Sequence, residues 1–221
     1  MVKITVDEKQ IEAQEGKSLL QACLENGIYI PNLCFLKDME NPTGSCRLCF
    51  VEIEGEEKLH TSCNTKVTEG MVVRTDTPGV RQIQKVVFQL LFSAHHMDCG
   101  HCLSKGKCDL QKIARLIGVK LKPRKIDELG RDLDTKRRHP CFDLLPSRCI
   151  LCQKCLYVCK QKNKNPVLTI VRNGFDSAID SSWEGDPSSV PCKECRACIE
   201  VCPVGAIVPR DEPAHEESQG A

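Results

Sequence analysis

The feature that most constrains this chain is a cysteine pattern that occurs twice between Arg148 and Pro203. Both copies have the spacing C-x2-C-x2-C-x3-C, which is a ligand spacing for cubane iron–sulfur clusters. The first three cysteines of a copy wrap one cluster, and the fourth ligates the other cluster. The sequence therefore predicts two [4Fe–4S] clusters with exchanged ligands. The predicted ligands are Cys149, Cys152, Cys155 and Cys202 for cluster one, and Cys159, Cys192, Cys195 and Cys198 for cluster two.

Zinc and disulfide bonds are the alternatives to this interpretation. Zinc also uses C-x2-C pairs, but two well-separated pairs normally make one tetrahedral site. Three cysteines at successive intervals of three, with a fourth four residues later, are more than such a site needs. Disulfides belong mainly to secreted chains, and the N-terminal residues 1–7 lack the apolar region of a signal peptide. No apolar run approaches the length of about eighteen residues that predicts a transmembrane helix. We therefore expect a cytoplasmic chain whose cysteines bind metal and which meets a membrane only through partners.

The composition agrees with a metal-rich chain. Seventeen cysteines among 221 residues are far above ordinary usage, and one Trp and two Tyr leave the core to aliphatic residues and clusters. Because thiolates must gather around iron before their loops have a shape, folding is expected to depend on metal. The 31 basic and 30 acidic residues nearly cancel, which gives no support for nucleic acid as a partner.

A second cysteine set lies in residues 1–78, with the spacing C-x11-C-x2-C-x13-C. A close pair with a distant cysteine is typical of plant-type [2Fe–2S] ferredoxins, although the first interval is longer here. A zinc site from the same cysteines is the alternative. The predicted ligands of the [2Fe–2S] cluster are Cys34, Cys46, Cys49 and Cys63.

The segments around this set predict a β-grasp ferredoxin domain. Apolar and polar residues alternate over Lys3–Asp7 and more weakly over Lys9–Gln14, as in a β-hairpin. Ser18–Asn26 is expected to form a helix that its first residue caps and that Gly27 ends. Cys23 in this helix is expected to be a small buried apolar residue. Later strands are predicted at Val51–Ile53 and Met71–Thr75.

Residues 79–120 form a third predicted module. The apolar residues recur at helical spacing over Gly79–Ala94, and a second helix is expected from Cys108 to Leu116. The apolar stripe of the first helix consists of Val80, Ile83, Val86, Val87, Leu90 and Leu91. Between the helices, Cys99, Cys102 and Cys108 leave a cubane one ligand short. On the residues alone, His95, His96 and His101 compete for the fourth position.

The remaining chain is divided by composition. Residues 121–138 are rich in charge and predict a solvated connection, residues 139–208 hold the double motif, and residues 209–221 form a polar tail. Within the double-motif domain, Val167–Arg172 and Phe175–Ile179 are expected to pair as a hairpin around an Asn-Gly turn. Fifteen of the seventeen cysteines have a place in a ligand set. The two that remain are Cys23 and Cys141.

These motifs, in this order, resemble the N-terminal iron–sulfur region shared by the large iron–sulfur subunit of NADH–quinone oxidoreductase and by iron-only hydrogenases. The resemblance covers about residues 1–208. The phrase His-x-x-Asp-Cys-x-x-Cys-x5-Cys-Asp-Leu-Gln carries much of it, and it assigns His95 as the fourth ligand of the [4Fe–4S] cluster held by Cys99, Cys102 and Cys108. The resemblance implies an α+β architecture of a β-grasp ferredoxin, a small helical module and a two-cluster ferredoxin domain.

Longer members of this family continue into a catalytic or molybdopterin-type domain, whereas this chain ends. It is therefore similar to the small iron–sulfur diaphorase subunit of NAD(P)-linked hydrogenases and of electron-bifurcating complexes. In those complexes a separate flavoprotein carries FMN and the NAD(P) site. This agrees with the lack of G-x-G-x-x-G and G-x4-G-K-S/T nucleotide motifs in the sequence.

The resulting expectation is an electron-transfer subunit with one [2Fe–2S] and three [4Fe–4S] clusters and no catalytic residue or further cofactor of its own. Its expected partners are a flavin- and NAD(P)-binding subunit and a second redox subunit or a ferredoxin. The alternatives are the iron–sulfur chain of a respiratory NADH–quinone oxidoreductase, a free polyferredoxin and a zinc-stabilised interaction module.

Overall fold

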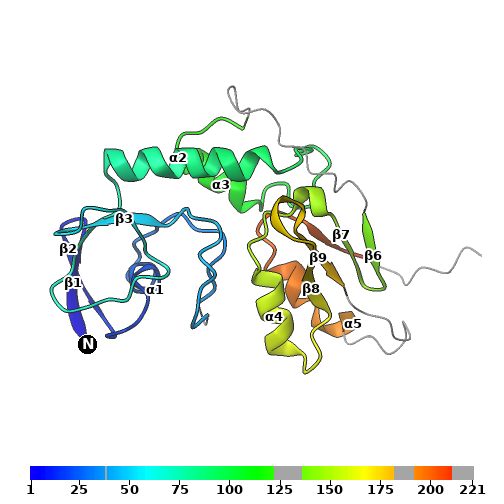
Figure 1. The fold of residues 1–221 in the computed structure, drawn as a ribbon, viewed down its shortest axis with the longest axis horizontal. Helices are drawn as coiled ribbons and strands as arrows, with labels where there is room; N and C mark the ends of the chain where they lie inside the picture. Colours follow the sequence, from blue (N-terminus) through cyan, green and yellow to red (C-terminus); the bar gives the residue numbers. More distant parts are fainter. Residues whose placement is uncertain (38, 122–135, 182–191, 211–221) are drawn as a thin grey trace, which may run out of the picture. The chain divides into compact units, whose positions relative to one another are not determined.

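The computed structural model describes residues 1–37, 39–121, 136–181 and 192–210. The chain forms two compact units (Figure 1). Unit 1 comprises Met1–Ser93 and Asp109–Asp127, and unit 2 comprises Ala94–Cys108 and Glu128–Ala221. Most of the predicted charged connection (121–138) and of the predicted polar tail (209–221) lies outside the described residues.

Unit 1 is built on a five-stranded mixed sheet with the strand order β2-β1-β5-β3-β4. The predicted hairpin is confirmed, because β1 and β2 pair antiparallel with Ile4 opposite Ile11. The alternation of the sequence places Val2, Ile4 and Val6 on the buried face. β5 pairs parallel to β1 and antiparallel to β3. The strands are β1 (Val2–Val6), β2 (Lys9–Ala13), β3 (Phe50–Ile53), β4 (His60–Thr61) and β5 (Val72–Arg74).

The predicted N-terminal helix is α1 (Leu19–Glu25). Ser18 caps it as predicted, since the Ser18 hydroxyl accepts a hydrogen bond from the Gln21 backbone N–H at 3.3 Å. Gly27 follows the helix in the left-handed conformation, with φ of 75°. Cys23 is fully buried in the core that α1 shares with the sheet, and burial raises the pKa of its thiol to about 12. The hairpin, the helix and the later strands β3 and β5 are the features predicted for the β-grasp module.

Two further helices, α2 (Pro78–Ser93) and α3 (Asp109–Leu116), belong to unit 1. The apolar stripe identified in the sequence coincides only in part with the buried face of α2. Its buried apolar residues are Val80, Phe88 and Phe92, with Gln84 between them, whereas Val86 and Leu90 are exposed. The two phenylalanine rings stack at a centroid distance of 5.8 Å, so the buried face follows the aromatic residues four apart rather than the aliphatic ones.

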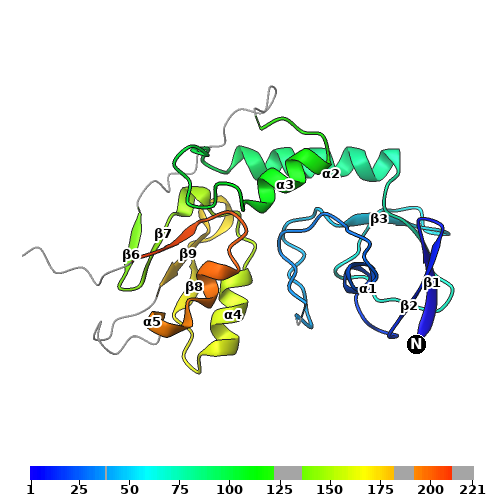
Figure 2. The same ribbon diagram turned by 180° about the vertical axis from the view of Figure 1, so that it is seen from behind.

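Unit 2 contains a three-stranded antiparallel sheet that the sequence pattern does not predict (Figure 2). β7 is its central strand, paired on one side with β6 and on the other with β10. The strands are only three residues long, too short to show an alternation. They are β6 (Arg137–His139), β7 (Phe142–Leu144) and β10 (Ile207–Pro209).

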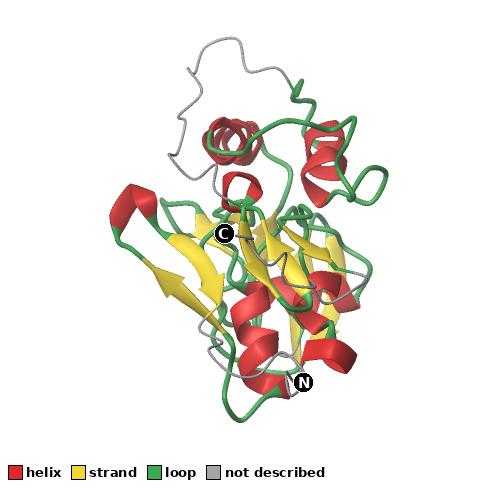
Figure 3. Cartoon of the chain, turned by 90° about the vertical axis from the view of Figure 1, so that its right-hand side faces the viewer, coloured by secondary structure: helices red, strands yellow, loops and turns green. Residues whose placement is uncertain are grey.

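The predicted hairpin of unit 2 is confirmed, but its turn is not the expected two-residue turn. β8 (Leu168–Val171) pairs antiparallel with β9 (Ala178–Ser181), and residues 172–177 connect them. The 3-10 helix η2 (Gly174–Asp176) occupies this connection, so the second strand begins three residues later than predicted. The helices of unit 2 are η1 (Pro146–Arg148), α4 (Lys154–Lys162), α5 (Cys192–Cys195) and α6 (Ala197–Glu200), and Figure 3 distinguishes helices from strands by colour.

Within the described ranges, none of the helices combines the length and the apolar character that crossing a membrane requires.

Gly205 lies in close contact with another loop of unit 2. It has a φ of 66°, and a Cβ atom at this position would clash with Ser104 Oγ. Ser104 belongs to the loop between Cys102 and Cys108, and Gly205 follows Cys202 by three residues. The close approach therefore joins the loop of the third predicted ligand set to the loop of cluster one.

We predict that Gly205→Ala destabilises unit 2 more than Gly174→Ala. Gly174 has a similar φ of 62°, but a Cβ atom there would have no neighbour within 4 Å. Alanine at this position therefore measures only the free-energy cost of a left-handed backbone conformation. That cost is about 1–2 kcal/mol, and the clash with Ser104 adds about 1–3 kcal/mol. Denaturant unfolding of the two anaerobically reconstituted variants measures the difference, and an equal loss in both would contradict the close contact.

Candidate metal centres

The four cysteines of the N-terminal set lie together in unit 1 as two close pairs. The sulfur atoms of Cys34 and Cys46 are 3.4 Å apart, and the Leu33 backbone N–H donates to Cys46 Sγ at 3.4 Å. Cys49 and Cys63 form the second hydrogen-bonded pair. All four are buried to at least 98%. The structure thus brings together the residues predicted to hold the [2Fe–2S] cluster.

Hydrogen bonds within these pairs separate the pKa values of their members. The pKa of Cys34 is lowered to about 5, chiefly by its hydrogen bond with Cys46, and the Ser45 and Thr43 side chains contribute further hydrogen bonds. The pKa of Cys46 is raised by the same hydrogen bond and by burial. The hydrogen bond from Cys63 likewise lowers the pKa of Cys49 to about 7. One sulfur of each pair is therefore prepared to ionise and bind metal.

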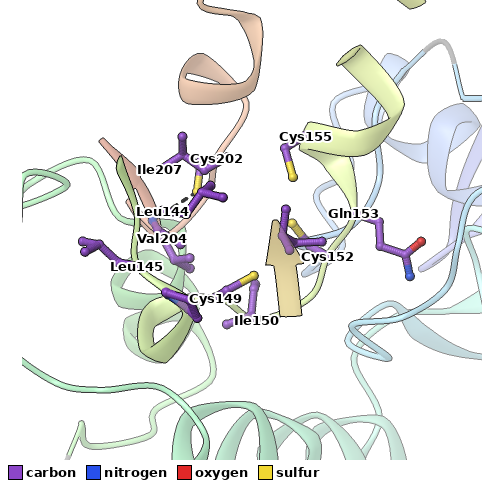
Figure 4. A pocket seen from close by; sticks show the side chains of 13 residues that line it. Leu144, Leu145, Cys149, Ile150, Cys152, Gln153, Cys155, Cys202, Val204 and Ile207 are labelled. Atoms are coloured by element: carbon purple, nitrogen blue, oxygen red, sulfur yellow. Dashed lines mark hydrogen bonds between the residues drawn. The ribbon is translucent and has the colours of Figure 1, made fainter. Parts of the chain in front are cut away.

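In unit 2, one cavity is lined by all four predicted ligands of cluster one (Figure 4). The sulfur atoms of Cys149, Cys152, Cys155 and Cys202 face this common space, while the Gln153 side chain turns away from it. Cys202 comes from the end of the second motif, more than forty residues after the other three. The other lining residues are mainly apolar, among them Leu144, Pro146, Ile150, Ile179, Val204 and Ile207.

A second cavity of unit 2 is lined by the four predicted ligands of cluster two, Cys159, Cys192, Cys195 and Cys198. Cys155 and Cys159 both lie on α4, one helical turn apart, yet each lines a different cavity. The wall is again largely apolar and includes Phe142, Val167 and Leu168. The fourth cysteine of each motif thus lies with the first three of the other motif.

Backbone N–H groups approach the sulfurs of the fourth cysteines. The Val167 N–H donates to Cys159 Sγ at 3.3 Å, and the Ala206 N–H donates to Cys202 Sγ at 3.3 Å. Leu151 N–H donates to Cys149 Sγ at 3.4 Å. Such hydrogen bonds stabilise negative charge on sulfur and are one of the means by which a protein adjusts a cluster potential.

Three of the C-x2-C loops share a strained backbone feature. The residue directly after the first cysteine of each pair is left-handed, with φ of 54° at Arg47, 62° at Gln153 and 43° at Arg196. This conformation costs about 1–2 kcal/mol for a residue with a side chain. Strain of this kind persists where the surroundings require it and is concentrated at functional sites. The three loops, all of which carry predicted ligands, thus share one local backbone conformation.

The third set is less enclosed than the other three. Cys99 is exposed, Cys102 is partly exposed and Cys108 is buried. Within the described ranges, no three Cys, His, Asp or Glu side chains converge on a point that could hold a single metal ion. The same holds for the cysteines of the other three sets, so the grouping of Cys99, Cys102 and Cys108 with His95 stays a prediction.

The imidazole of His95 is nevertheless prepared for a metal. Its Nδ1 lies 2.8 Å from the Arg148 carbonyl oxygen, and because a carbonyl only accepts, Nδ1 must carry the proton. Nε2 is then left as the nitrogen with a free lone pair. Metal-bound histidines usually donate their other N–H in this way. Burial lowers the pKa of His95, which favours the neutral form that binds metal.

The competing histidines differ from His95 in exposure and contacts. The His101 side chain is 89% exposed and its Nδ1 pairs with Asp98. His96 donates its backbone N–H to the Ser147 carbonyl oxygen at 2.8 Å. The contacts of Arg148 and Asp98 in this region have no signal in the cysteine spacing, and only the tertiary structure reveals them.

The residues present fit iron–sulfur clusters. Each cavity offers four thiols spaced around an apolar space, and a cubane requires four thiolates around its body. A zinc ion needs its four ligands within about 2.3 Å of one point. Cys141 lines neither cavity, which agrees with its exclusion from the ligand sets.

Comparison with known proteins places two domains on this chain. Residues 1–78 match the 2Fe-2S iron–sulfur cluster binding domain, and residues 84–122 match the NADH-ubiquinone oxidoreductase-G iron–sulfur binding region. A G-type subunit of the NADH-quinone oxidoreductase of Rhizobium meliloti is 36% identical over 94% of this chain, which spans 24% of that protein. The gamma subunit of the NAD-reducing hydrogenase HoxS of Cupriavidus necator is 27% identical over 94% of this chain and 86% of that protein.

A solved structure of an NAD+-reducing [NiFe]-hydrogenase in the H2-reduced state contains a similar chain. The TM-score is 0.81 at 28% identity, covering 97% of this chain and 89% of that one. The resemblance found in the sequence is thereby confirmed over nearly the whole chain.

Paired substitutions test whether the two motifs exchange their fourth ligands. If they do, Cys159→Ser with Cys198→Ser damages one cluster and removes about four irons, whereas Cys202→Ser with Cys198→Ser damages two and removes about eight. Unexchanged ligands would reverse the two results. Iron analysis after anaerobic reconstitution gives the count, and Cys141→Ser is the matched control that should retain all iron.

Cluster retention is predicted to fall as the pH falls. Burial raises the pKa of Cys152, Cys192 and Cys198 to about 12, so iron must displace a proton from each thiol. Proton competition grows at low pH and weakens binding. The metal-free fold has the opposite dependence above pH 9, because unfolded thiols ionise while the buried ones stay protonated. Charge-transfer absorbance against pH measures retention, and a pH-independent absorbance would refute the prediction.

Proposed function

We propose that the chain is an iron–sulfur electron-transfer subunit. The proposal is supported by the match of residues 1–78 to the 2Fe-2S iron–sulfur cluster binding domain and of residues 84–122 to the NADH-ubiquinone oxidoreductase-G iron–sulfur binding region. The chain relays electrons between a flavin- and NAD(P)-binding subunit and a second redox partner, which is a hydrogenase, a ferredoxin or another oxidoreductase. Clusters supply one-electron transfer when bound. No residue of the chain needs to act as an acid, a base or a nucleophile.

The proposed ligands are those predicted from the sequence. The [2Fe–2S] cluster is held by Cys34, Cys46, Cys49 and Cys63. One [4Fe–4S] cluster is held by His95, Cys99, Cys102 and Cys108. Cluster one is held by Cys149, Cys152, Cys155 and Cys202, and cluster two by Cys159, Cys192, Cys195 and Cys198. The domains follow these sets, with a ferredoxin domain in 1–78, the histidine module in 79–120, a connection in 121–138, a two-cluster ferredoxin domain in 139–208 and a tail in 209–221.

The observation that carries the proposal is the pair of cavities in unit 2. Each is lined by one complete predicted quartet, although the quartets combine cysteines from two motifs far apart in the sequence. A purely structural role for these cysteines would not require four sulfurs around each of two neighbouring apolar spaces. Two cubanes held close together in one small domain are suited to electron transfer.

The complex in which the chain works is inferred from its relatives. The hydrogenase gamma subunit and the chain in the hydrogenase structure match this chain over most of their own lengths. This supports a complex in which another subunit carries FMN and binds NAD(P), in the cytoplasm. The 36% identity to part of a NADH-quinone oxidoreductase favours a respiratory complex as the second candidate. A free polyferredoxin is the third.

Anaerobic purification of the protein from its native host tests the proposal. We expect about fourteen irons per chain, the sum for one [2Fe–2S] and three [4Fe–4S] clusters. We also expect stoichiometric flavin and an attached NAD(P)-binding subunit, identified by mass. Zinc in place of iron would overturn the cluster assignment. Full iron without flavin or a fixed partner would replace the complex subunit by the free polyferredoxin.

A further inference from the structure

The loop that carries His95 is tied to the segment before Cys149 by main-chain contacts. The Arg148 carbonyl oxygen accepts the hydrogen bond from His95 Nδ1 at 2.8 Å. The adjacent Ser147 carbonyl oxygen accepts one from the His96 backbone N–H, also at 2.8 Å. Arg148 is the last residue of η1 and directly precedes Cys149, the first predicted ligand of cluster one. The peptide unit between Arg148 and Cys149 therefore connects the His95 imidazole, a predicted ligand of one cluster, to Cys149, a predicted ligand of another.

The side chain of Arg148 reaches back to the same loop. Its Nη2 lies 3.7 Å from Asp98 Oδ2, and the arginine side chain is only 14% exposed. Asp98 is the residue before Cys99, and its other oxygen pairs with His101 Nδ1 at 2.9 Å. Both ends of Arg148, the carbonyl and the guanidinium, thus engage the segment between His95 and Cys99.

We propose that Arg148 is a positioning residue that orients His95 as a ligand and holds the Cys99 loop against the first ligand loop of cluster one. This inference rests on the proposed function, since it assumes that His95 binds a cluster. The contact between Ser104 and Gly205 restrains the far end of the same loop against the segment after Cys202. With both ends restrained, the separation of the two centres is fixed, and electron transfer between them depends on that separation.

Two substitutions distinguish the effect of charge on the midpoint potential from the effect of losing the restraint on the loop. Arg148→Met removes a cation near the histidine-ligated cluster and should lower its midpoint potential, because a nearby positive charge favours the reduced form. Asp98→Asn removes an anion and should raise that potential. Both variants remove the ion pair between Arg148 and Asp98. A loss of positional order should therefore appear in both, whereas the potentials move in opposite directions.

The experiment is a redox titration of the full, anaerobically reconstituted chain, followed by electron paramagnetic resonance. The signal of the histidine-ligated cluster is identified by its loss in His95→Ala. We expect that signal to broaden in Arg148→Met and in Asp98→Asn, with opposite shifts in potential. Arg148→Lys should restore the potential but not the line shape, since an ammonium lacks the planar reach of a guanidinium. Arg138→Met, at an exposed arginine of the same unit, is the matched control and should leave the signal unchanged.

Different results would contradict the positioning role of Arg148 and the proposed electron-transfer function. Wild-type line shapes in both Arg148→Met and Asp98→Asn, with or without shifts in potential, would overturn the positioning role. Should Arg148→Met not fold, the nearly isosteric Asp98→Asn decides alone. A wild-type chain that lacks the iron of one cubane, or a His95→Ala variant that keeps every signal, would instead refute the proposed ligand set.

Discussion

The desolvation of cysteine sulfur is the constraint on which this structure depends. Unit 2 buries thiols among aliphatic side chains, and burial raises the pKa of several of them to about 12. The predicted ligands of unit 2 line two largely apolar cavities. A raised pKa keeps a thiol protonated at neutral pH. In the proposed function, iron displaces these protons and occupies the spaces between the sulfurs. Metal binding and formation of the core would then be one process in this unit.

Unit 1 also buries its cysteines, but it has a continuous core of aliphatic side chains. Its core of β1, β2, α1 and neighbouring segments is continuous and aliphatic, and it includes Cys23 as an ordinary buried residue. The cysteines predicted to bind metal form two hydrogen-bonded pairs, and Cys49 and Cys63 are themselves part of this core. Because each pair already contains one sulfur of lowered pKa, the site is prepared before metal arrives. We infer that this unit depends less on its cluster for its fold than unit 2 does.

The loops that surround the candidate centres are fixed mainly by the backbone. Left-handed residues follow the first cysteine of three C-x2-C pairs, and main-chain N–H groups donate to several sulfurs. Main-chain carbonyls also orient His95 and restrain its neighbour. Such contacts leave side chains free to vary at most positions. They explain how a chain that is 28% identical to a chain of a hydrogenase can share its fold over nearly the whole length.

The parts of this protein that rest on local spacing could be predicted from its sequence. Cysteine intervals identified the quartets that line both cavities, and alternation and capping residues located β1, β2 and α1. Tertiary structure alone decided the rest. Strands β6, β7 and β10 are too short to carry a pattern, and the buried face of α2 follows Phe88 and Phe92 because aromatic packing outweighs the aliphatic stripe. Likewise, the link from His95 to Arg148 joins residues 53 positions apart through a main-chain carbonyl. Every residue has such a carbonyl, so no choice of amino acid could have revealed it.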